Sequence, residues 1–327
     1  MVANARQECA ISQSQIDHFN EYGYVRLGGL LSRSDVSNLR EAMTQALATF
    51  ASSPNSYNVT AVADAFWSDA ANDNQGSSQH DLAELAQCVR KSGHPRLVDE
   101  QIAGTRRGRF LLDTSAWRRT RELERFALAS TLPAISATLL QAGEIRYYDD
   151  QLFVKEPGAV DRAAFHQDFP YFHLSEPRGC VFWIPLDCAG PGGGRLAYVP
   201  GSHRWGDVYK PNIFVSALAF PGSEGADMPA IDASPESFGA VYIDVEPGDV
   251  LVHHFLTIHG SEGNRGTTAR RAFSLRYCDA ALTYKRRAGA PDQPLHRADM
   301  KDGDMLDPTI HPIVWPQIGD GMRRGAA

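Results

Sequence analysis

Residues 165–171 have the sequence FHQDFPY, which places a histidine, His166, two positions before a carboxylate, Asp168. We expect this stretch to form a strand, on which residues i and i+2 point to the same face. His166 and Asp168 can then reach one metal ion together, with Gln167 turned away. Because a histidine and a carboxylate at this spacing occur by chance in many proteins, the pair needs support from the rest of the chain.

A third ligand is available in residues 249–261, DVLVHHFLTIHGS, which hold three histidines. His253 and His259 have the same strand parity, so either can in principle reach a metal held by His166 and Asp168. Two histidines and one carboxylate on one face of an octahedral metal leave three positions open, which is the arrangement of non-haem Fe(II) oxygenases. On parity alone the choice between His253 and His259 stays open.

Around these histidines the sequence alternates between short apolar segments and turns. The pentapeptide GPGGG at 190–194 is expected to be a turn, because glycine and proline both favour turn conformations. Many short strands between such turns indicate a β-sandwich or barrel. The expected strands are 145–155, 165–169, 179–187, 195–199, 241–245, 250–254 and 271–278.

The N-terminal part of the chain favours helices. Serines at 12 or 14 and at 32 or 34 are suitable N-caps for two helices, and Gly23 is expected to end the first. Residues 24–27 alternate like a strand between them, and residues 117–142 are helical again with an apolar stripe. Residues 51–108 are polar and irregular, apart from a weak helix at 81–91.

We interpret the whole chain, residues 1–327, as one domain, and its 43% hydrophobic content is ample for a substantial core. A helical flank and covering segment span 12–142, and a β core spans 144–279. The core carries a long insertion at 213–240, and a loop of that length is usually functional or disordered. An irregular tail follows at 280–327.

The composition argues against several classes of function. The net charge is −7 without a basic stripe, so nucleic-acid binding is not expected. No apolar run approaches the length of a membrane span, and residues 1–11 lack the apolar segment of a secretory signal. Five scattered cysteines without a CxxC pair favour a reducing, cytoplasmic location with free buried thiols at Cys180 and Cys278. The sequence does not indicate an oligomeric state.

Several motifs resemble those of the phytanoyl-CoA dioxygenase (PhyH) family of Fe(II)- and 2-oxoglutarate-dependent oxygenases. They occur in the family's order, at near-family spacing, over most of the chain. They are FNEYGYV at 19–25, LLS at 30–32, KEPG at 155–158, HQD at 166–168, Trp183, VPGSH at 199–203, GDV at 248–250, HGS at 259–261 and RRAFS at 270–274. The resemblance implies a double-stranded β-helix, or jelly roll, with flanking N-terminal helices. In that fold, strands distant in sequence lie side by side, which brings His259 toward His166.

The resemblance also implies a role for each site residue. The implied iron ligands are His166, Asp168 and His259. Arg270 lies eleven residues after the last of these, where the family places the arginine that grips the far carboxylate of 2-oxoglutarate. Gln151 and Trp183 match positions against the co-substrate, although core packing explains Trp183 equally well. His253 and His254 are then interpreted as pocket or core histidines.

The predicted strand that begins at Arg270 supports this arginine independently. One face carries Arg270, Ala272, Ser274 and Arg276, and the other carries Arg271, Phe273, Leu275 and Tyr277. The face with small residues leaves space for a ligand, and a guanidinium can hold a carboxylate through two parallel hydrogen bonds. Arg271, on the bulky face, fits a surface salt bridge better. Other candidates for a substrate pocket are Phe169, Tyr171, Arg178 and Arg276. Lys155 is a weaker candidate for contact with the co-substrate, because an exposed strand end fits it better.

We therefore predict an enzyme that uses Fe(II), 2-oxoglutarate and O2 to oxidise a small-molecule metabolite, releasing succinate and CO2. Hydroxylation is favoured because Asp168 is present, whereas some halogenating relatives lack that carboxylate. The alternatives are desaturation or ring formation at the same iron site, or a non-catalytic cupin-like protein that binds a metal or ligand. A simple metal-binding module would not need Arg270. The substrate cannot be read from the sequence, and residues 51–108 and 213–240 are the candidate lids.

Overall fold

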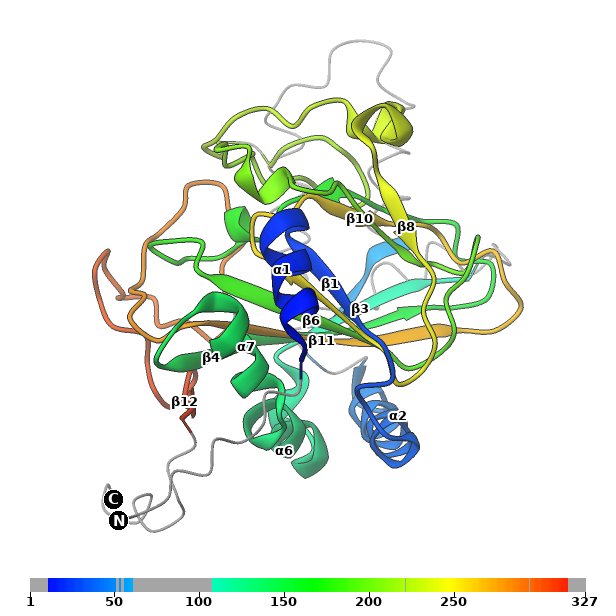
Figure 1. The fold of residues 1–327 in the computed structure, drawn as a ribbon, viewed down its shortest axis with the longest axis horizontal. Helices are drawn as coiled ribbons and strands as arrows, with labels where there is room; N and C mark the ends of the chain where they lie inside the picture. The colour runs from blue at the N-terminus through cyan, green and yellow to red at the C-terminus, as the bar shows by residue number, and fades with distance from the viewer. Residues whose placement is uncertain are drawn as a thin grey trace.

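A computed structural model describes residues 11–50, 53, 56–60, 108–220, 222–293 and 295–316. Cys9, Cys88 and the helix expected at 81–91 lie outside the described residues. Two antiparallel sheets form two layers, with helices beneath the larger sheet and irregular loops above the smaller one (Figure 1). This is the jelly roll with flanking helices that the sequence predicts. None of the described helices is long and apolar enough to cross a membrane.

The larger sheet has eight strands in the order β1-β9-β6-β11-β4-β3-β2, and β12 pairs with β4 outside this order. These strands are β1 Tyr24–Leu27, β2 Ser56–Asn58, β3 Phe110–Thr114, β4 Ile145–Lys155, β6 Gly179–Pro185, β9 Val250–His254, β11 Arg270–Asp279 and β12 Ile313–Trp315. The bounds of β4 and β9 agree with the prediction, and β11 starts and ends one residue beyond it. The strands β2, β3 and β12 were not predicted, because three to five residues are too few for a clear period of two.

The smaller sheet has the strand order β5-β10-β7-β8. Its strands are β5 Ala163–His166, β7 Leu196–Tyr198, β8 Val241–Ile243 and β10 His259–Ser261. The strand β10 was not predicted, again because it is only three residues long. It lies between β5 and β7, and His259 pairs directly with His166. The fold therefore joins two segments that are far apart in the sequence.

The strand predicted at 165–169 ends early, at His166, and Asp168 does not lie on it. Asp168 has helical dihedral angles, φ −77° and ψ −37°, and caps the short 3-10 helix η3 Phe169–Tyr171. Its amide donates to the carbonyl of Phe255 instead of a strand neighbour. Pro170 lacks an N–H group and fixes its own φ, which suits the first turn of a helix better than a strand. The prediction that a shared strand face unites the two side chains is therefore wrong.

The helices begin and end mostly where the capping residues predict. They are α1 Gln13–Tyr22, α2 Arg33–Leu47, α6 Arg121–Ala129 and α7 Leu132–Leu140, with 3-10 helices at η2 Ala116–Arg118, η4 Ser202–Arg204, η5 Ile231–Ala233 and η6 Pro235–Phe238. Ser12 and Ser32 each form a capping box, and Gly23 ends α1 in the left-handed region. A Cβ at Gly23 would also collide with His203 and Thr257. The single helical region expected at 117–142 is divided near Ser130.

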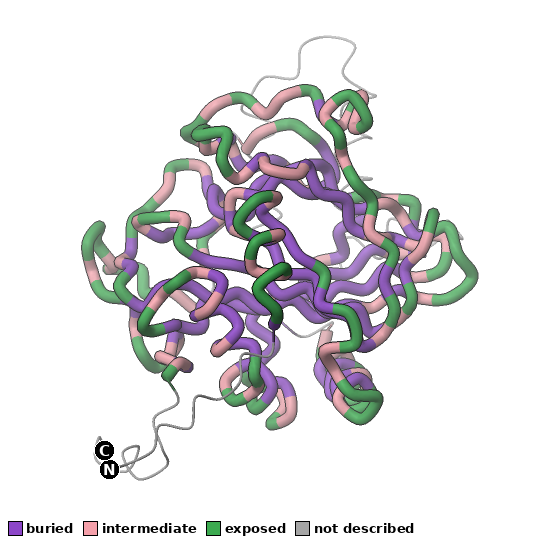
Figure 2. Tube along the Cα trace, viewed as in Figure 1, coloured by how far each residue is buried: buried purple, intermediate pink, exposed green. Residues whose placement is uncertain are grey.

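The main core lies between these helices and the larger sheet. It includes Leu39, Met43, Phe126, Phe182 and Phe273, and all of them are buried. The strands form the buried interior in Figure 2, whereas the helices are exposed on their outer sides. Cys180 and Cys278 are buried and unpaired, as predicted. Because helices cover one face of the larger sheet, only its other face, toward the smaller sheet, can line a site.

The strands β4 and β11 pair along their whole length with one irregularity. Arg276 pairs with Asp149, but the next residue, Tyr277, pairs with Tyr147. Tyr148 is therefore an extra residue in β4, which is a β-bulge. It leaves the alternation of the strand and packs into a separate apolar cluster beside the C-terminal tail.

The described part of the tail is irregular apart from β12, as predicted, and it packs against the larger sheet. The His311 ring stacks on the Tyr148 ring at 5.2 Å between centroids, and its Nδ1 donates to the Tyr148 carbonyl at 2.8 Å. His296 Nε2 lies 3.0 Å from His311 Nε2. Pro291 and Gln293 then reach the rim of a cavity between the sheets. The bulge residue thus fastens the tail onto the sheet.

Candidate metal and ligand site

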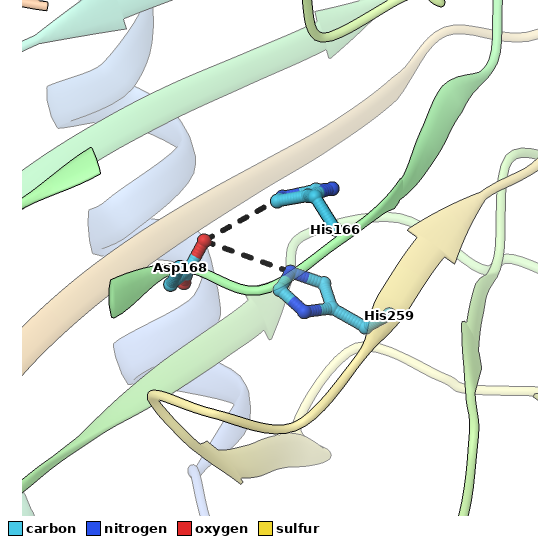
Figure 3. Close-up of side chains that lie close together, drawn as sticks. All are labelled: His166, Asp168 and His259. Carbon is cyan, nitrogen blue, oxygen red and sulfur yellow. Dashed lines mark ion pairs between the residues drawn. The ribbon is translucent and has the colours of Figure 1, made fainter. Parts of the chain in front are cut away.

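His166, Asp168 and His259 converge between the two sheets (Figure 3). The Nε2 atoms of His166 and His259 lie 3.5 Å and 3.8 Å from Oδ1 of Asp168. All three ligating atoms lie within 4.8 Å of one another, and no other trio of such side chains in the described ranges does so. An octahedral metal with bonds of about 2.1 Å holds adjacent donors about 3 Å apart, so small side-chain movements suffice to bind one.

Backbone contacts fix the tautomer of both histidines. His166 Nδ1 lies 2.7 Å from the Ala164 carbonyl, and His259 Nδ1 lies 3.0 Å from the Thr257 carbonyl. A carbonyl oxygen can only accept, so each Nδ1 carries the proton and each Nε2 keeps its lone pair. Metal-binding histidines in proteins are oriented by this kind of contact. The donor set therefore fits a divalent cation such as Fe(II).

The protonation states of Asp168 and His259 also suit metal binding. Burial works against a charge on Asp168, but the surrounding His259 and His166 outweigh burial and hold the pKa of this carboxyl well below its usual range. Burial, together with His253 and His166, lowers the pKa of His259 well below that of a free imidazole. An ionised carboxylate beside a neutral imidazole is the state in which both bind a metal.

The side chain of Gln167 keeps the Asp168 turn in place. It points away from the triad, as expected, and its amide donates to the carbonyls of Asp207 and Leu256, each at 3.1 Å. Its carbonyl oxygen accepts from the amide of Tyr209 at 3.0 Å. These three bonds replace the ladder that β5 loses after His166.

His253 lies beside the same carboxylate. Its Nε2 is 3.5 Å from Oδ2 of Asp168, and its Nδ1 is 3.1 Å from the hydroxyl of Tyr198. It stands outside the group of three whose ligating atoms lie mutually close. Burial lowers its pKa, so it is a neutral pocket histidine. His254 faces away, and its Nδ1 accepts from the amide of Leu256 at 3.1 Å.

Arg270 lines an inner recess next to the triad, together with Trp183 and Ser261. It is 3% exposed, and its Nε and Nη1 have no hydrogen-bond partner among the described residues. The guanidinium carbon lies 5.3 Å from the centre of the Trp183 ring. Burial lowers the pKa of Arg270 to about 10, so the group stays charged at neutral pH. A buried cation with unused donors is a site for an anion.

Lys155 is 0% exposed, so the prediction of an exposed strand end is wrong. The β4–β11 register places it opposite Arg270, and its Nζ donates to Ser261 Oγ at 2.8 Å. Burial and the neighbouring Arg270 lower the pKa of Lys155 well below its usual value. Gly194 leaves room for both cations, because a Cβ there would lie 3.0 Å from Arg270 Nε. Two basic side chains are thus neighbours at this point, with Arg270 lining the recess and the buried Lys155 next to it.

A second cavity, of about 200 Å³, meets the triad and continues along β4 and β11 toward Asp149. Its apolar walls come from Tyr57, Leu112, Phe172, Phe214 and Phe220. The residues that it shares with the inner recess are Gln151, His166, Asp168, Phe214 and Arg276. Two candidate metal ligands, His166 and Asp168, therefore stand where the two spaces meet, and His259 lines the inner recess.

Of the residues predicted to line a substrate pocket, two do so and two do not. Tyr171 and Arg276 line the second cavity, whereas Arg178 is at the surface, paired with Asp279 at 2.8 Å. Phe169 belongs to an apolar cluster instead of the cavity lining. Gln151 lies where the two spaces meet, and its oxygen accepts from Arg276 Nη2.

Arg271 forms the expected salt bridge away from the site. Its Nε and Nη2 each donate to a carboxylate oxygen of Asp187 at 2.8 Å. On β11, Arg270, Ser274 and Arg276 therefore face the cavity, as the strand alternation predicts.

Sequence reasoning missed several residues of the site, among them Asp149, Phe214 and Ser261, and it expected Lys155, which is buried beside Arg270, at an exposed strand end. Strand alternation could have found two of them. Asp149 and Lys155 share the parity of Gln151 on β4, so the face assigned to Gln151 carries them too. Phe214 lies in a part of the insertion that precedes η5 and η6 and has no regular structure, so no periodicity indicates which side chain points inward.

A jelly roll that holds two histidines and a carboxylate between its sheets defines the class of cupin-like proteins with a facial-triad metal site. Within that class, residues 19–272 match the model of the family described as phytanoyl-CoA dioxygenase (PhyH), and the chain belongs to this family.

Among relatives, a protein named "Probable phytanoyl-CoA dioxygenase" from Caenorhabditis elegans is 30% identical over 124 residues. That match covers 38% of this chain and 38% of the relative, so the chain spans well under half of the relative's length in the match.

Solved structures show that the fold is shared over nearly the whole chain. The non-heme alpha ketoglutarate dependent carbocyclase SnoK from nogalamycin biosynthesis has a TM-score of 0.64 at 22% identity, covering 93% of this chain and 96% of that one. EctD from S. alaskensis, solved with 2-oxoglutarate and 5-hydroxyectoine, has a TM-score of 0.56 at 17% identity, covering 92% and 87%.

Proposed function

We propose that this protein is an Fe(II)- and 2-oxoglutarate-dependent dioxygenase that hydroxylates a small-molecule metabolite and releases succinate and CO2. The proposed iron ligands are His166, Asp168 and His259. Arg270 is proposed to bind the 5-carboxylate of 2-oxoglutarate, and Gln151 and Trp183 are proposed to lie against that co-substrate. Family membership and the donor set of the triad support this assignment.

One observation carries the proposal: a buried guanidinium with unused donors opens into the same space as the triad. A protein that only stores a metal has no need of a second, cationic group there. A planar guanidinium instead suits a carboxylate, which it can hold through two parallel hydrogen bonds. The non-catalytic cupin-like alternative leaves Arg270 without a purpose.

The protein's own residues position the reactants and exclude water. Fe(II), with 2-oxoglutarate and O2, supplies the oxidative decarboxylation that drives oxidation of the substrate. Arg270 holds the co-substrate at its far end, and Trp183 packs against that guanidinium. Phe214 and Phe220 belong to the 213–240 insertion and line the same cavity as His166. Their side chains shield the reacting centre from solvent. The part of the 213–240 insertion nearest the site can therefore act as a lid.

Titration with 2-oxoglutarate of the Fe(II)-loaded protein, without oxygen, tests the proposal. The measured quantity is the metal-to-ligand absorption band. Arg270→Ala should weaken co-substrate binding about 30-fold or more, because truncating one member of a buried charge pair costs about 2–5 kcal/mol. Arg270→Lys should restore only part of the affinity, since an ammonium cannot reproduce the two-pronged contact.

Arg271→Ala is the matched control, because Arg271 sits one position along the strand, faces the opposite side and is paired with Asp187. It should change co-substrate affinity by much less. Equal affinities in wild type and Arg270→Ala would remove the co-substrate assignment and leave the non-catalytic alternative.

Desaturation or ring formation at the same iron site remains the runner-up outcome, and product analysis by mass spectrometry separates it from hydroxylation through a gain of oxygen. A cytoplasmic location is also part of the proposal, based on the unpaired buried thiols Cys180 and Cys278. Cell fractionation tests it.

A further inference from the structure

Arg276 is a second buried arginine with unused donors. It is 4% exposed, and its Nε and Nη1 have no hydrogen-bond partner in the described part of the chain. Its Nη2 donates to the oxygen of Gln151, and its guanidinium carbon lies 5.6 Å from the centre of the Phe172 ring. Two N–H directions are thus left for something inside the cavity, because leaving buried donors unmet is costly.

An acidic side chain faces this arginine from the neighbouring strand. The register pairs Arg276 with Asp149, so both side chains leave the same face of the sheet, and both line the second cavity. Within the described residues they are not joined by an ion pair at 4.0 Å or less. Ser115 Oγ contacts Asp149 Oδ1 at 3.2 Å, which leaves acceptor capacity on the carboxyl group. A donor and an acceptor therefore stand apart in one polar patch.

The remainder of the cavity is mostly apolar. Tyr57, Leu112, Phe172, Phe214 and Phe220 contribute its walls. Aromatic walls of this kind favour flat or ring-shaped apolar bodies, which stack on them at little entropic cost. The polar patch and two proposed iron ligands, His166 and Asp168, line the same cavity, so a head group bound at the patch stays in the space that reaches the reacting centre.

We propose that Arg276 and Asp149 select the substrate, which is a mostly apolar, ring-sized molecule with an uncharged head that offers an acceptor to Arg276 and a donor to Asp149. A primary amide or a hydroxyl next to a carbonyl has this chemistry. A carboxylate head would satisfy Arg276 but meet Asp149 with like charge, and an ammonium head would do the reverse. This inference rests on the proposed function, since it concerns the substrate of the same iron site.

Three probes with one common body test the head-group preference: phenylacetamide, phenylacetate and 2-phenylethylammonium. Their dissociation constants are measured by calorimetry, first on metal-free protein and then on the anaerobic complex with Fe(II) and 2-oxoglutarate. A probe of this size that gains about 0.3 kcal/mol per non-hydrogen atom has a dissociation constant in the millimolar range. The amide should bind about tenfold more tightly than either charged probe.

Two variants connect this preference to the two side chains. Arg276→Met keeps the apolar bulk and should weaken amide binding about tenfold or more, as expected for a lost hydrogen bond to a charged group. Asp149→Asn removes the like charge and should bring phenylacetate to at least the affinity of the amide. Arg178→Met, at an arginine half exposed on the surface, is the matched control and should leave all three constants unchanged.

Equal binding of the three probes, or no detectable binding of the amide, overturns the inference. So does an unchanged preference in a folded Arg276→Met protein, where thermal melting reports on folding. The two hypotheses fail separately, because probe selectivity is read without metal and co-substrate affinity is read without probes. Loss of the Arg270 effect with probe selectivity intact refutes the oxygenase but leaves the head-group assignment standing.

Discussion

The part of the β4–β11 pair that precedes the bulge, from Arg270 to Arg276, has a buried arginine at each of its two ends, and the residues opposite the two arginines differ in kind. At one end Arg270 pairs across the strands with Lys155, and at the other Arg276 pairs with Asp149. Both arginines are buried, and both keep guanidinium nitrogens that have no hydrogen-bond partner within the described residues. The difference lies in the residue opposite, which is a basic side chain, Lys155, at the first end and an acidic one, Asp149, at the second.

The residue opposite thus determines which ligand each arginine can hold. Arg270 presents unused donors to the recess beside a second basic side chain, so this end favours an anion such as a carboxylate of 2-oxoglutarate. A cation opposite an acid is already balanced, so it favours a neutral group that donates and accepts. Two proposed metal ligands, His166 and Asp168, line both spaces. The same sheet face can therefore bind the co-substrate at the Arg270 end and the substrate at the Arg276 end.

Loss of the metal should have the largest effect, because the reactants bound at both ends depend on it for turnover. Asp168→Ala deletes the one proposed anionic iron ligand, so iron content should fall from about one per chain to none after dialysis, and succinate formation should stop. Metal analysis and a coupled succinate assay measure this. Asp244→Ala, at an exposed carboxylate, is the control. Full activity in Asp168→Ala would sink the triad assignment.

Neutralising the doubly basic end should affect one ligand and spare the other. Lys155→Met removes the basic group opposite Arg270 and its bond to Ser261, so 2-oxoglutarate affinity should fall about tenfold. Binding of phenylacetamide at the other end should stay within a factor of two. The same anaerobic absorption titration and calorimetry give both numbers. A comparable loss at both ends would show that the two ends do not act separately.

His253 tests whether the centre between the two ends has been assigned correctly. His253→Ala removes a neighbour of Asp168 that we do not place on the metal, so iron affinity should fall by less than about tenfold. His259→Ala should abolish iron binding. The reverse result, with iron lost only in His253→Ala, would exchange the third ligand. Competition with a chelator of known affinity measures both variants.

Acid is expected to loosen the C-terminal tail, which borders the cavity near Arg276, before it unfolds β11. This is the smallest of the expected effects. Burial lowers the pKa of His296 to about 4, below its unfolded value of about 6.5. The folded state thus resists protonation, so this contribution to stability is present above about pH 6.5 and is lost as the pH falls toward about 4. Unfolding free energy should drop by about 1–2 kcal/mol between pH 7 and pH 5 from this group.

Denaturant titration at the two pH values measures that drop, and His296→Phe should reduce it. Hydrogen exchange should show earlier opening in residues 281–316 than in β11. Uniform opening of both segments would mean that the tail and the sheet respond to acid as one unit.

Patterns with a clear period predicted much of this molecule, and patterns without one predicted little. The alternation of β11 correctly assigned Arg270 and Arg271 to opposite faces, and the caps of α1 and α2 were also correct. Asp168 was placed on a strand because an i, i+2 spacing fits one, yet a turn delivers it to the same place. The spacing of two side chains does not distinguish an extended segment from a turn that other residues hold in place.

The burial of Lys155 shows a second limit. A lysine at the end of a strand is usually exposed, and only the neighbouring turn, with Gly194 against it, creates the pocket for its side chain. The cross-strand partner of a residue depends on the strand register, which cannot be determined from a single sequence. The charge pairing that distinguishes the two ends was therefore beyond the reach of the sequence, although each residue was visible in it.

Tyr148 separates the attachment of the tail from the lining of the cavity. As the extra residue of the bulge it stacks on His311, while its neighbour Asp149 stays opposite Arg276 on the cavity side. Changes in the tail are therefore expected to alter the outer rim of the cavity, where Pro291 and Gln293 lie, and to leave Asp149 and Arg276 in place.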